Sequence, residues 1–528
     1  MIFSRHNSVA VTYDELQDDE RSQFAATEVR LGKKGWSARI SMLALMSFFV
    51  GYNGYEIVQG RLALLSIYAI FALLVSGFIF IVGWLFFTAP TRTRVSSLTR
   101  HKDGGTTTRD ELVSVIIPVY NQLALIERVL DAVYYSTYDN IEVIVVDDGS
   151  TDGTDAILDR LAREKYPRLV VFHKEKNAGK RKAVATGIIR GSRGEYIILI
   201  DSDSMIDKNA ISEMMTAFAK NPRLGAIAGQ GKVWNADKNH MTKWQEVWYD
   251  FAFNIQKTCE SYFGAVTCCS GCLAGYRREA ISRLVEHWDA NETTTGDHAY
   301  QEQLARDERN FLCGQKPKNE IGITNIEERD AVIASLIARD RLEKVSPFGG
   351  RNGLSKKLLY SMADYDDCED GALTAYTLAK WDTAYVPGAI VHTEIPDNNR
   401  AYFRQQQRWK KGYLRAALFA STFVWRRKNP IMSLLFYTQL VSAFTLPLII
   451  SLIPLFILLG YYDVWTALTF VASILTIGLL KGVDYWIRSK MHRHFLYGPL
   501  MEFVSSFLLP WLILPALANY KKNKWLTR

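Results

Sequence analysis

The sequence lacks the two glycine-rich patterns by which many proteins bind nucleotide phosphates. No GxGxxG motif follows the first predicted strand, and no P-loop ending in GKS or GKT occurs in the chain. The first pattern binds dinucleotides, and the second binds nucleoside triphosphates. A dinucleotide site and an NTPase site are therefore disfavoured.

Cysteine is scarce, and every cysteine lies in the central part of the chain. The six cysteines are Cys259, Cys268, Cys269, Cys272, Cys313 and Cys368. The cluster at 268–272 hints at a metal knuckle, but no second CxxC or pair of histidines completes it. We expect reduced, partly buried thiols on the cytosolic side rather than disulfides or a zinc site.

The chain also lacks a strong excess of one charge. The net charge is +8, and the basic residues gather beside apolar segments instead of forming a stripe. Basic residues in that position are typical of the cytosolic edge of a membrane protein. Nucleic acid is therefore not an expected partner, whereas membrane lipids are.

Long apolar runs, by contrast, are plentiful. Segments of about 20 residues, the length that spans a bilayer, occur at about 37–57, 62–88, 430–460, 464–486 and 495–519. The polar N-terminal arm has no signal-peptide architecture, so no cleavage is expected. Basic residues precede the first segment and follow the second, and the positive-inside rule then places the N-terminus and residues 89–425 in the cytosol.

The topology of the last third stays open. Basic residues at 488–493 and in the tail at 520–528 both favour the cytosol, yet one span between them would separate them. Either 495–519, which contains Pro510 and Pro515, is re-entrant or a broken hairpin, or 430–460 is not one simple span. We favour the first alternative and a cytosolic tail.

Between the apolar segments, strand patterns alternate with helix patterns. Strands are predicted at 113–118, 141–146, 169–173 and 196–200, and helices near 125–133, 155–165 and 180–190. This alternation predicts an α/β domain with a doubly wound, mostly parallel sheet. Ligand groups are then expected at the carboxyl ends of the strands.

Acidic residues follow two of these strands. Asp147 and Asp148 can accept hydrogen bonds from a base or ribose, while Asp201 and Asp203 can reach a ribose and a divalent cation that holds a diphosphate. One such cluster would be an ordinary strand-to-turn ending. Two clusters, together with Lys180, favour a nucleotide and metal site.

Two further motifs lie nearer the membrane segments. Glu369 and Asp370 precede a predicted helix, so they either cap it or supply a general base with an acidic neighbour. Gln405, Arg408 and Trp409 share one helix face. That face suits a sugar nucleotide, although a membrane anchor would look similar. The acidic motifs decide in favour of a catalytic cleft.

Together these motifs resemble the processive, membrane-embedded, inverting glycosyltransferases of family 2, which include cellulose, chitin and hyaluronan synthases. The motifs occur in order as IIPVYN at 116–121, DDGS at 147–150, DxD at 201–203, ED at 369–370 and QxxRW at 405–409. The stretch 252–277 and the terminal WLTR are more similar still to hyaluronan synthases and their rhizobial chitin-oligosaccharide synthase relatives. The resemblance implies a GT-A-like α/β domain with a mixed or parallel sheet, joined to transmembrane and interfacial helices.

The resemblance also implies how the chain is divided. The expected parts are a cytosolic arm at 1–36, two transmembrane helices at 37–88, a cytosolic glycosyltransferase domain at 89–400, an interfacial QxxRW helix at 401–425, transmembrane or re-entrant helices at 426–519 and a cytosolic tail at 520–528. Two features depart from hyaluronan synthases. Gly371 and Ala372 replace Arg-His after the acidic dyad, and a polar insertion occupies about 290–360. The insertion contains Asp297, but Asp370 has the family spacing to Gln405. We favour a solvated excursion for the insertion over a regulatory or acceptor-side element.

Carried over to matching positions, the resemblance assigns a role to each motif. The catalytic residues would be Asp370 as the base, Glu369 and Arg408; UDP-sugar binding would fall to Tyr120, Asp147, Asp148, Lys180, Asp201, Gln405 and Arg408; the acceptor would contact Ser270, Gly271 and Trp409; and Asp201 and Asp203 would hold Mg²⁺ or Mn²⁺.

The implied function is a processive synthase in the plasma membrane that secretes a growing β-linked polysaccharide through its own channel. Hyaluronan, made from UDP-GlcNAc and UDP-GlcA, is the favoured product. A chitin-type or glucan homopolymer is the alternative. A non-processive transferase that acts on a lipid carrier and a catalytically inert membrane scaffold are the rival interpretations; the first generally lacks QxxRW, and the intact acids argue against the second.

Overall fold

The computed structural model describes residues 33–59, 63–87, 111–166, 168–290, 353–364, 368–427, 429–461, 463–489 and 492–520. Most of the N-terminal arm, most of the insertion with Asp297 and Cys313, and the tail from 521 lie outside the described residues. The chain divides into two compact units. The helical unit takes its residues from Met1–Ser97, Ala236–Gln256 and Ile449–Phe507, and the sheet unit from Leu98–Asn235, Lys257–Leu448 and Leu508–Arg528.

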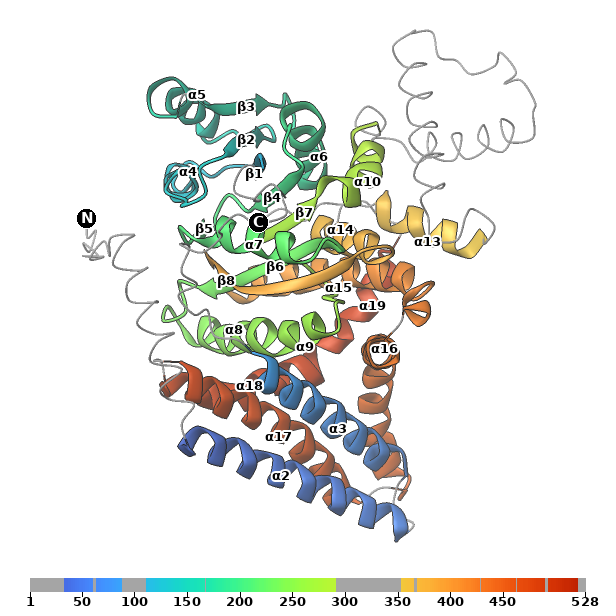
Figure 1. Cartoon of the computed structure of the whole chain (residues 1–528). Coiled ribbons are helices and arrows are strands. Elements are labelled where there is room, and N and C mark those ends of the chain that lie inside the picture. The colour runs from blue at the N-terminus through green and yellow to red at the C-terminus, as the bar shows by residue number, and fades with distance from the viewer. Residues whose placement is uncertain are drawn as a thin grey trace, which may run out of the picture. The chain divides into compact units, whose positions relative to one another are not determined.

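The sheet unit is built around eight strands in the order β3-β2-β1-β4-β7-β6-β8-β5 (Figure 1). The strands are β1 Val113–Val119, β2 Ile141–Asp147, β3 Leu169–His173, β4 Tyr196–Ile200, β5 Met205–Ile206, β6 Leu224–Val233, β7 Leu273–Arg277 and β8 Asp382–Thr393. Strands β1 to β4 are parallel, and so are β6 and β8, whereas β7 runs antiparallel to both β4 and β6. The sheet is therefore mixed.

The four strands predicted from the sequence are confirmed, each to within one residue. All residues of β1 and β4 are buried, which explains their continuous apolar, β-branched composition. The predicted helices also form, as α4 Ile126–Tyr134, α5 Thr154–Glu164 and α6 Lys180–Thr186, the last continuing as a π-helical turn, Gly187–Gly191. The expected α/β class is confirmed.

Further helices complete the sheet unit. They are α7 Ala210–Lys220, α9 Lys257–Tyr262, α10 Arg278–Ala290, α13 Gly353–Ala363, α14 Glu369–Leu378, α15 Asn399–Ala420 and α19 Ile513–Ala518, with the 3-10 turn Val424–Arg426 after α15. The acidic dyad begins α14, and the QxxRW motif lies in α15. The unit boundary falls inside α16 Pro430–Leu458.

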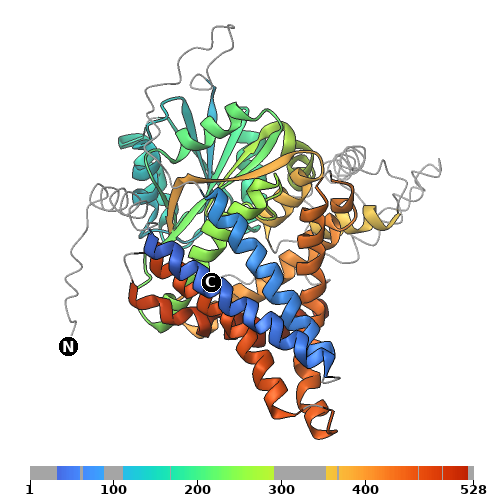
Figure 2. The same ribbon diagram turned by 60° about the horizontal axis from the view of Figure 1, so that its bottom comes forward.

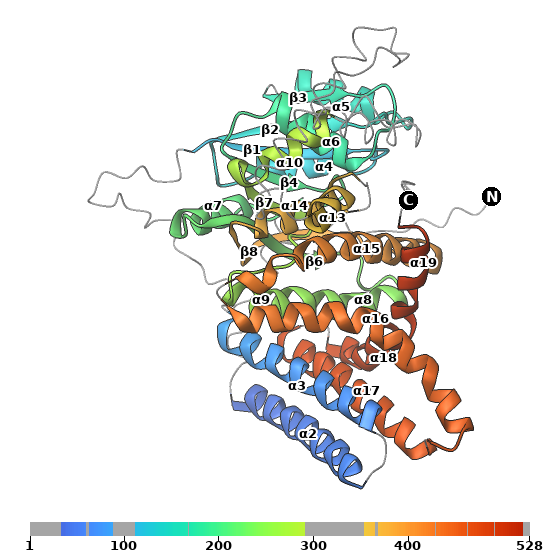
Figure 3. The same ribbon diagram turned by 90° about the vertical axis from the view of Figure 1, so that its right-hand side faces the viewer.

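The helical unit contains α2 Lys33–Val58, α3 Ala63–Phe86, α8 His240–Phe251 with the π-helical turn Ala252–Gln256, α17 Val464–Arg488, the 3-10 turn His492–Leu496 and α18 Tyr497–Phe503. Helices α2, α3 and α17 pack side by side (Figures 2 and 3). Leu65 and Ala69 of α3 form a buried apolar cluster with Phe470 and Ile474 of α17.

Among the described residues, four helical segments are long and apolar enough to cross a membrane. They are Leu65–Phe86, Pro430–Leu458, Val464–Arg488 and His494–Ala518. Helix α2 forms where a span was predicted but is not one of the four, because Arg39, Asn53 and Glu56 lower its hydropathy; all three side chains are buried. Helix α16 stays continuous through its prolines.

The last apolar stretch, by contrast, is broken. It consists of α18, the π-helical turn Val504–Leu508, the 3-10 turn Leu509–Leu512 and α19. Pro510 lies at the start of that 3-10 turn, where its missing N–H and fixed φ interrupt a regular helix.

A buried ionic network joins the helices of the helical unit. Asp484 of α17 accepts hydrogen bonds from Arg39 of α2 at 3.0 Å, Trp84 of α3 at 2.8 Å and Arg488 at 3.0 Å. Arg488 also pairs with Asp250 of α8 at 2.6 Å. Buried charges are tolerated only when paired. This network therefore ties α8, which follows β6 in the chain, to helices from both ends of the sequence.

We predict that Asp484→Ala strongly destabilises the helical unit. The substitution leaves Arg39 buried without its carboxylate, which costs about 3–5 kcal/mol. Thermal unfolding of the detergent-solubilised protein measures the effect. Asp463→Ala is the matched control, because Asp463 caps α17 by accepting from Thr466 N at 2.7 Å and the loss of a cap costs about 1 kcal/mol. Equal losses of melting temperature would contradict the prediction.

Candidate active site

The DDGS motif ends β2 and organises the loops around it. Asp148 accepts hydrogen bonds from the backbone N–H groups of Ala178 at 3.1 Å and Gly179 at 2.8 Å. Gly149 has a φ of 75°, and a Cβ there would lie 2.8 Å from the backbone nitrogen of Asn177. Glycine is therefore required where this turn meets the loop that leads into Lys180.

Asp147, the other acid of this motif, reaches sideways to β3. It accepts from Ser150 N at 3.0 Å and lies 3.0 Å from Nδ1 of His173, whose Nε2 lies 3.2 Å from Asp159 of α5. The two acids predicted to bind a nucleotide thus also hold the local structure.

Tyr120 follows β1 beside the same motif. Its side chain is 36% exposed. The next residue, Asn121, has a φ of 53°. Its Oδ1 accepts from Thr151 N at 2.8 Å, and its backbone N–H donates to Ser150 Oγ at 2.9 Å. These bonds fasten the IIPVYN motif to the DDGS motif, so the two lie together at the carboxyl ends of β1 and β2.

Lys180 joins two acidic motifs that are far apart in the sequence. Its Nζ lies 2.5 Å from Asp201 Oδ1 and also pairs with the carboxylate of Glu369. Burial lowers the pKa of Lys180, but the carboxylates of Asp201 and Glu369 outweigh it, so the pKa lies well above its ordinary value. Burial raises the pKa of Glu369, and although Lys180 opposes this, the pKa stays raised. Lys180 is therefore held as a cation between the DxD motif and the dyad.

Gly271, in the turn that precedes β7, lies against the same cluster. The pairing of Ile200 with Leu273 in the antiparallel β4–β7 ladder brings the residues just beyond each partner next to one another. A Cβ on Gly271 would accordingly lie 3.0 Å from Lys180 Nζ, 3.3 Å from Glu369 Oε1 and 3.5 Å from Asp201 Oδ1. A side chain at this position would crowd the charged ends of Lys180, Glu369 and Asp201. Ser270 precedes Gly271 in the same turn.

Asp370 is surrounded by hydrogen-bond donors. Its Oδ2 accepts from Gly271 N at 3.1 Å, and its Oδ1 accepts from Gly371 N at 2.7 Å and from the thiol of Cys368 at 2.9 Å. The thiol of Cys268 lies 3.8 Å from Oδ2. The structure thus brings Lys180, Asp201, Gly271, Glu369 and Asp370 together, as a single catalytic cleft requires.

The face of α15 that carries the QxxRW motif packs on the helix of the dyad. A Cβ on Gly412 would lie 2.2 Å from Cys368 Cβ, and one on Gly371 would lie 3.8 Å from Ala416 Cβ. Gln405, Arg408 and Trp409 are half-buried, one to two turns before Gly412 on the same face. The Oε1 atom of Gln405 is buried and accepts no hydrogen bond.

The residues expected to bind metal fit an ion shared with a ligand rather than an all-protein cage. Asp203 is 9% exposed and accepts from Ser204 Oγ at 3.1 Å. In the part of the chain that the structure describes, no group of three or more His, Cys, Asp or Glu side chains is arranged to hold a metal. Mg²⁺ commonly binds one or two carboxylates together with phosphates and water, which is what Asp201 and Asp203 offer.

Sequence reasoning missed three residues that support this site: His173, Cys368 and Gly412. The described cysteines are free thiols, as expected, but the sequence did not predict the contacts of Cys368 and Cys268 with Asp370. The one sequence feature that could have indicated the contact between Cys368 and Asp370 is the position of Cys368 directly before the acidic dyad.

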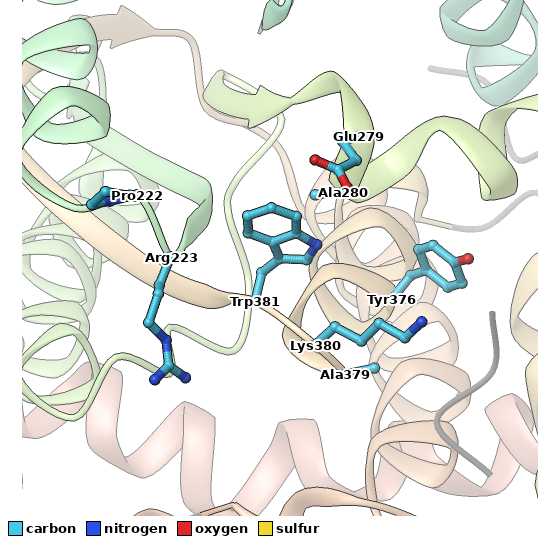
Figure 4. Close-up of a pocket in the computed structure, with 8 residues that line it drawn as sticks. All are labelled: Pro222, Arg223, Glu279, Ala280, Tyr376, Ala379, Lys380 and Trp381. Atoms are coloured by element: carbon cyan, nitrogen blue, oxygen red, sulfur yellow. The ribbon is translucent and has the colours of Figure 1, made fainter. Parts of the chain in front are cut away.

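A separate pocket of about 350 Å³ contains none of the predicted site residues (Figure 4). It lies at the carboxyl end of α14, the opposite end from the dyad. Its walls are Pro222, Arg223, Glu279, Ala280, Tyr376, Ala379, Lys380 and Trp381. The candidate active site therefore rests on the clustered acids and not on the shape of this cavity.

Several known proteins are similar to this chain. Residues 114–285 match Glycosyl transferase family 2. The chain is 26% identical over 421 residues to an N-acetylglucosaminyltransferase of Azorhizobium caulinodans, covering 79% of this chain and 87% of that protein. It is 27% identical over 425 residues to a hyaluronan synthase of Streptococcus pyogenes, covering 79% and 84%.

Among solved structures, the chain is similar to a mannosyltransferase from Pyrobaculum calidifontis in complex with GDP-Man and Mn²⁺. The TM-score is 0.44 at 17% identity, and the match covers 86% of this chain and 99% of the other.

The family match, the two relatives, the mixed sheet and the four membrane-length helices agree on one assignment. This chain is a glycosyltransferase with helices long and apolar enough to cross a membrane, and its residues 114–285 match Glycosyl transferase family 2.

Proposed function

We propose that this glycosyltransferase is a processive, inverting synthase that adds sugars from UDP-sugar donors to a β-linked polysaccharide and secretes the product through its own membrane helices. One observation carries the proposal: Lys180 holds Asp201 of the DxD motif and Glu369 of the dyad in one cluster. The groups proposed to bind the donor and to activate the acceptor would thereby meet at a single place, and the QxxRW helix packs on the same dyad helix.

The donor would bind across the carboxyl ends of β1, β2 and β4. Tyr120, Asp147 and Asp148 would border the uracil and ribose, and Lys180 and Asp201 would lie near the ribose and phosphates. Gln405 would contact the donor through its unpartnered Oε1. Arg408 would neutralise the charge that develops on the departing UDP.

Asp201 and Asp203 would hold Mg²⁺ or Mn²⁺ together with the diphosphate. When bound, the ion supplies positive charge to the leaving phosphates.

The acceptor would be activated by Asp370. Its carboxylate would take the proton from the acceptor hydroxyl while the oxygen attacks the anomeric carbon in line and the bond to UDP breaks. One displacement inverts the anomeric centre to a β-linkage, so no covalent sugar–enzyme intermediate is required. Trp409 would stack on the terminal sugar of the polymer, and Ser270 and Gly271 would line its path.

UDP-GlcNAc is the proposed donor. The two relatives, a hyaluronan synthase and an N-acetylglucosaminyltransferase, are almost equally similar to the chain, at 27% and 26% identity. Hyaluronan, from UDP-GlcNAc and UDP-GlcA, and a chitin-type GlcNAc polymer are therefore equally supported. A glucan remains a third alternative.

Purified protein supplied with radiolabelled UDP-GlcNAc and Mg²⁺ or Mn²⁺, with and without UDP-GlcA, separates these products. Hyaluronidase-sensitive polymer that forms only with both donors identifies hyaluronan. Polymer from UDP-GlcNAc alone identifies a chitin-type product. Transfer of a single sugar to a lipid would instead support the non-processive transferase. If the protein releases no UDP from any donor in the presence of metal, UDP-glucose included, the result would support the inert scaffold.

We predict that Asp370→Asn removes transfer while the protein folds and binds UDP normally. The amide keeps the size of the carboxylate but cannot accept the proton, and general bases contribute about 10²–10⁴-fold to rate. Polymer synthesis measures the loss of transfer, and UDP affinity measures the retained nucleotide binding. Asp139→Asn, at an exposed position of the same unit, is the control. Normal turnover by Asp370→Asn would move the base elsewhere, with Asp297 of the insertion as the next candidate.

We predict that Trp409→Ala abolishes polymer but leaves UDP binding within about twofold, because a stacked ring contacts the acceptor sugar and not the nucleotide. Phe403→Ala is the matched control. It removes an exposed aromatic ring, 42% accessible, from the opposite face of the same helix. Full-length polymer from Trp409→Ala would contradict the proposed acceptor platform.

We predict that His173 stabilises the nucleotide site more at low pH than at high pH. Burial lowers the pKa of His173, but hydrogen bonds to Asp147 and Asp159 outweigh it and raise the pKa. A raised pKa stabilises the fold fully below the unfolded value of about 6.5, and this contribution is lost as the pH rises through the folded value. His173→Gln should therefore lower the melting temperature more at pH 6 than at pH 9. Equal losses at both pH values would contradict the prediction.

A further inference from the structure

Cys368 lies between the two helices that carry the proposed chemistry. It is the N-cap residue of α14, but its side chain accepts no capping hydrogen bond. Its Sγ instead lies 2.9 Å from Asp370 Oδ1. Serine, threonine or aspartate at an N-cap normally accepts from the helix backbone, so this cysteine uses the position differently: it donates to a side chain.

The thiol is kept in the form that can donate. Burial raises the pKa of the Cys368 thiol, and the neighbouring carboxylate of Asp370 raises it further. The sulfur therefore keeps its hydrogen. Of the two thiols near Asp370, Cys368 makes the shorter contact, since Cys268 lies 3.8 Å from the other carboxylate oxygen.

The same side chain also spaces the two helices. A Cβ on Gly412 would lie 2.2 Å from Cys368 Cβ and 3.2 Å from its Sγ. Contacts below 3.0 Å require a shift of one backbone. The backbone of α15 thus rests on Cys368, one turn from Arg408 and Trp409.

We propose that Cys368 is a positioning residue for sugar transfer: its S–H group fixes the carboxylate of Asp370, and its Cβ sets the separation between the dyad and the QxxRW helix. This inference rests on the proposed role of Asp370 as the base. Cys368 itself touches neither donor nor acceptor.

The first test compares Cys368→Ala, Cys368→Ser and Cys259→Ala in the full-length protein. We expect kcat for polymer synthesis to fall about tenfold in Cys368→Ala with KM for UDP-GlcNAc within twofold, because a hydrogen bond to a charged group is lost while the donor site is untouched. Cys368→Ser keeps a hydroxyl donor and should recover most of the rate. Cys259, a buried thiol of α9 at 1% exposure, controls for the loss of a buried sulfur.

The second test separates packing from donation. Gly412→Ala should lower both melting temperature and activity, because its methyl group overlaps Cys368 Cβ. Adding Cys368→Gly removes the obstacle, so the double variant should regain the wild-type melting temperature. It should still show the tenfold loss of kcat, since it has no thiol.

The outcomes are distinct. Wild-type kcat in Cys368→Ala overturns the proposal, and so does a Cys368→Ser variant that folds but is as slow as Cys368→Ala. If Cys368→Ala lowers the melting temperature substantially along with kcat, the role of Cys368 is merely structural, and this outcome overturns the proposal as well. If the wild-type protein makes no polymer, or Asp370→Asn is fully active, the proposed function has failed instead.

Discussion

The sheet unit must accommodate three carboxylates close together, with Glu369 buried and Asp201 and Asp370 partly exposed. Asp201, Glu369 and Asp370 come from the end of β4 and the start of α14, and like charges in such surroundings repel strongly. Lys180 offsets this repulsion, because its ammonium group pairs with the carboxylates of Asp201 and Glu369. Asp370 is stabilised differently, by backbone N–H groups and a thiol.

The topology of the sheet explains why these groups meet. Strand β7 is inserted antiparallel between β4 and β6, so the turn before β7 arrives beside the end of β4. That turn carries Gly271, which lies against Lys180, Asp201 and Glu369. A purely parallel sheet would place the start of β7 at the opposite edge. The mixed sheet is therefore a requirement of the site.

Local patterns in the sequence predicted the first half of the sheet unit well and its connections poorly. Strands such as 169–173 and 196–200 are short apolar runs bounded by turns, and their burial follows from composition. Strand β7, with the sequence LAGYR, has no β-branched residue and gave no comparable signal. The sequence pattern predicts an unbroken helix over 180–190, whereas residues 187–191 form a π-helical turn.

In the candidate active site, too, some features could be predicted from the sequence and others could not. Its acidic residues could be identified from motifs, because each follows a strand or starts a helix. The partners of those acids could not, because the pairing of Lys180 with Glu369, and the contact of Gly412 with Cys368, join segments that are distant in sequence. Such contacts depend on the three-dimensional topology. Likewise, nothing in 240–256 marked α8 as part of the helical unit, since its ties, such as the pairs Asp250–Arg488 and Glu246–His494, join segments that are distant in sequence.

The two units treat buried charge in opposite ways, and the difference separates structure from function. In the helical unit, Asp484 and Asp250 face two arginines, Arg39 and Arg488, so the charges balance within the protein. In the sheet unit, one lysine pairs with two carboxylates, Asp370 follows one of them in the chain, and Asp203 adds a fourth carboxylate nearby in the chain. Helices with balanced charges need nothing further to be stable. A cluster with excess negative charge attracts a cation, which is why we regard the first network as structural and the second as the place where a charged ligand and its metal ion bind.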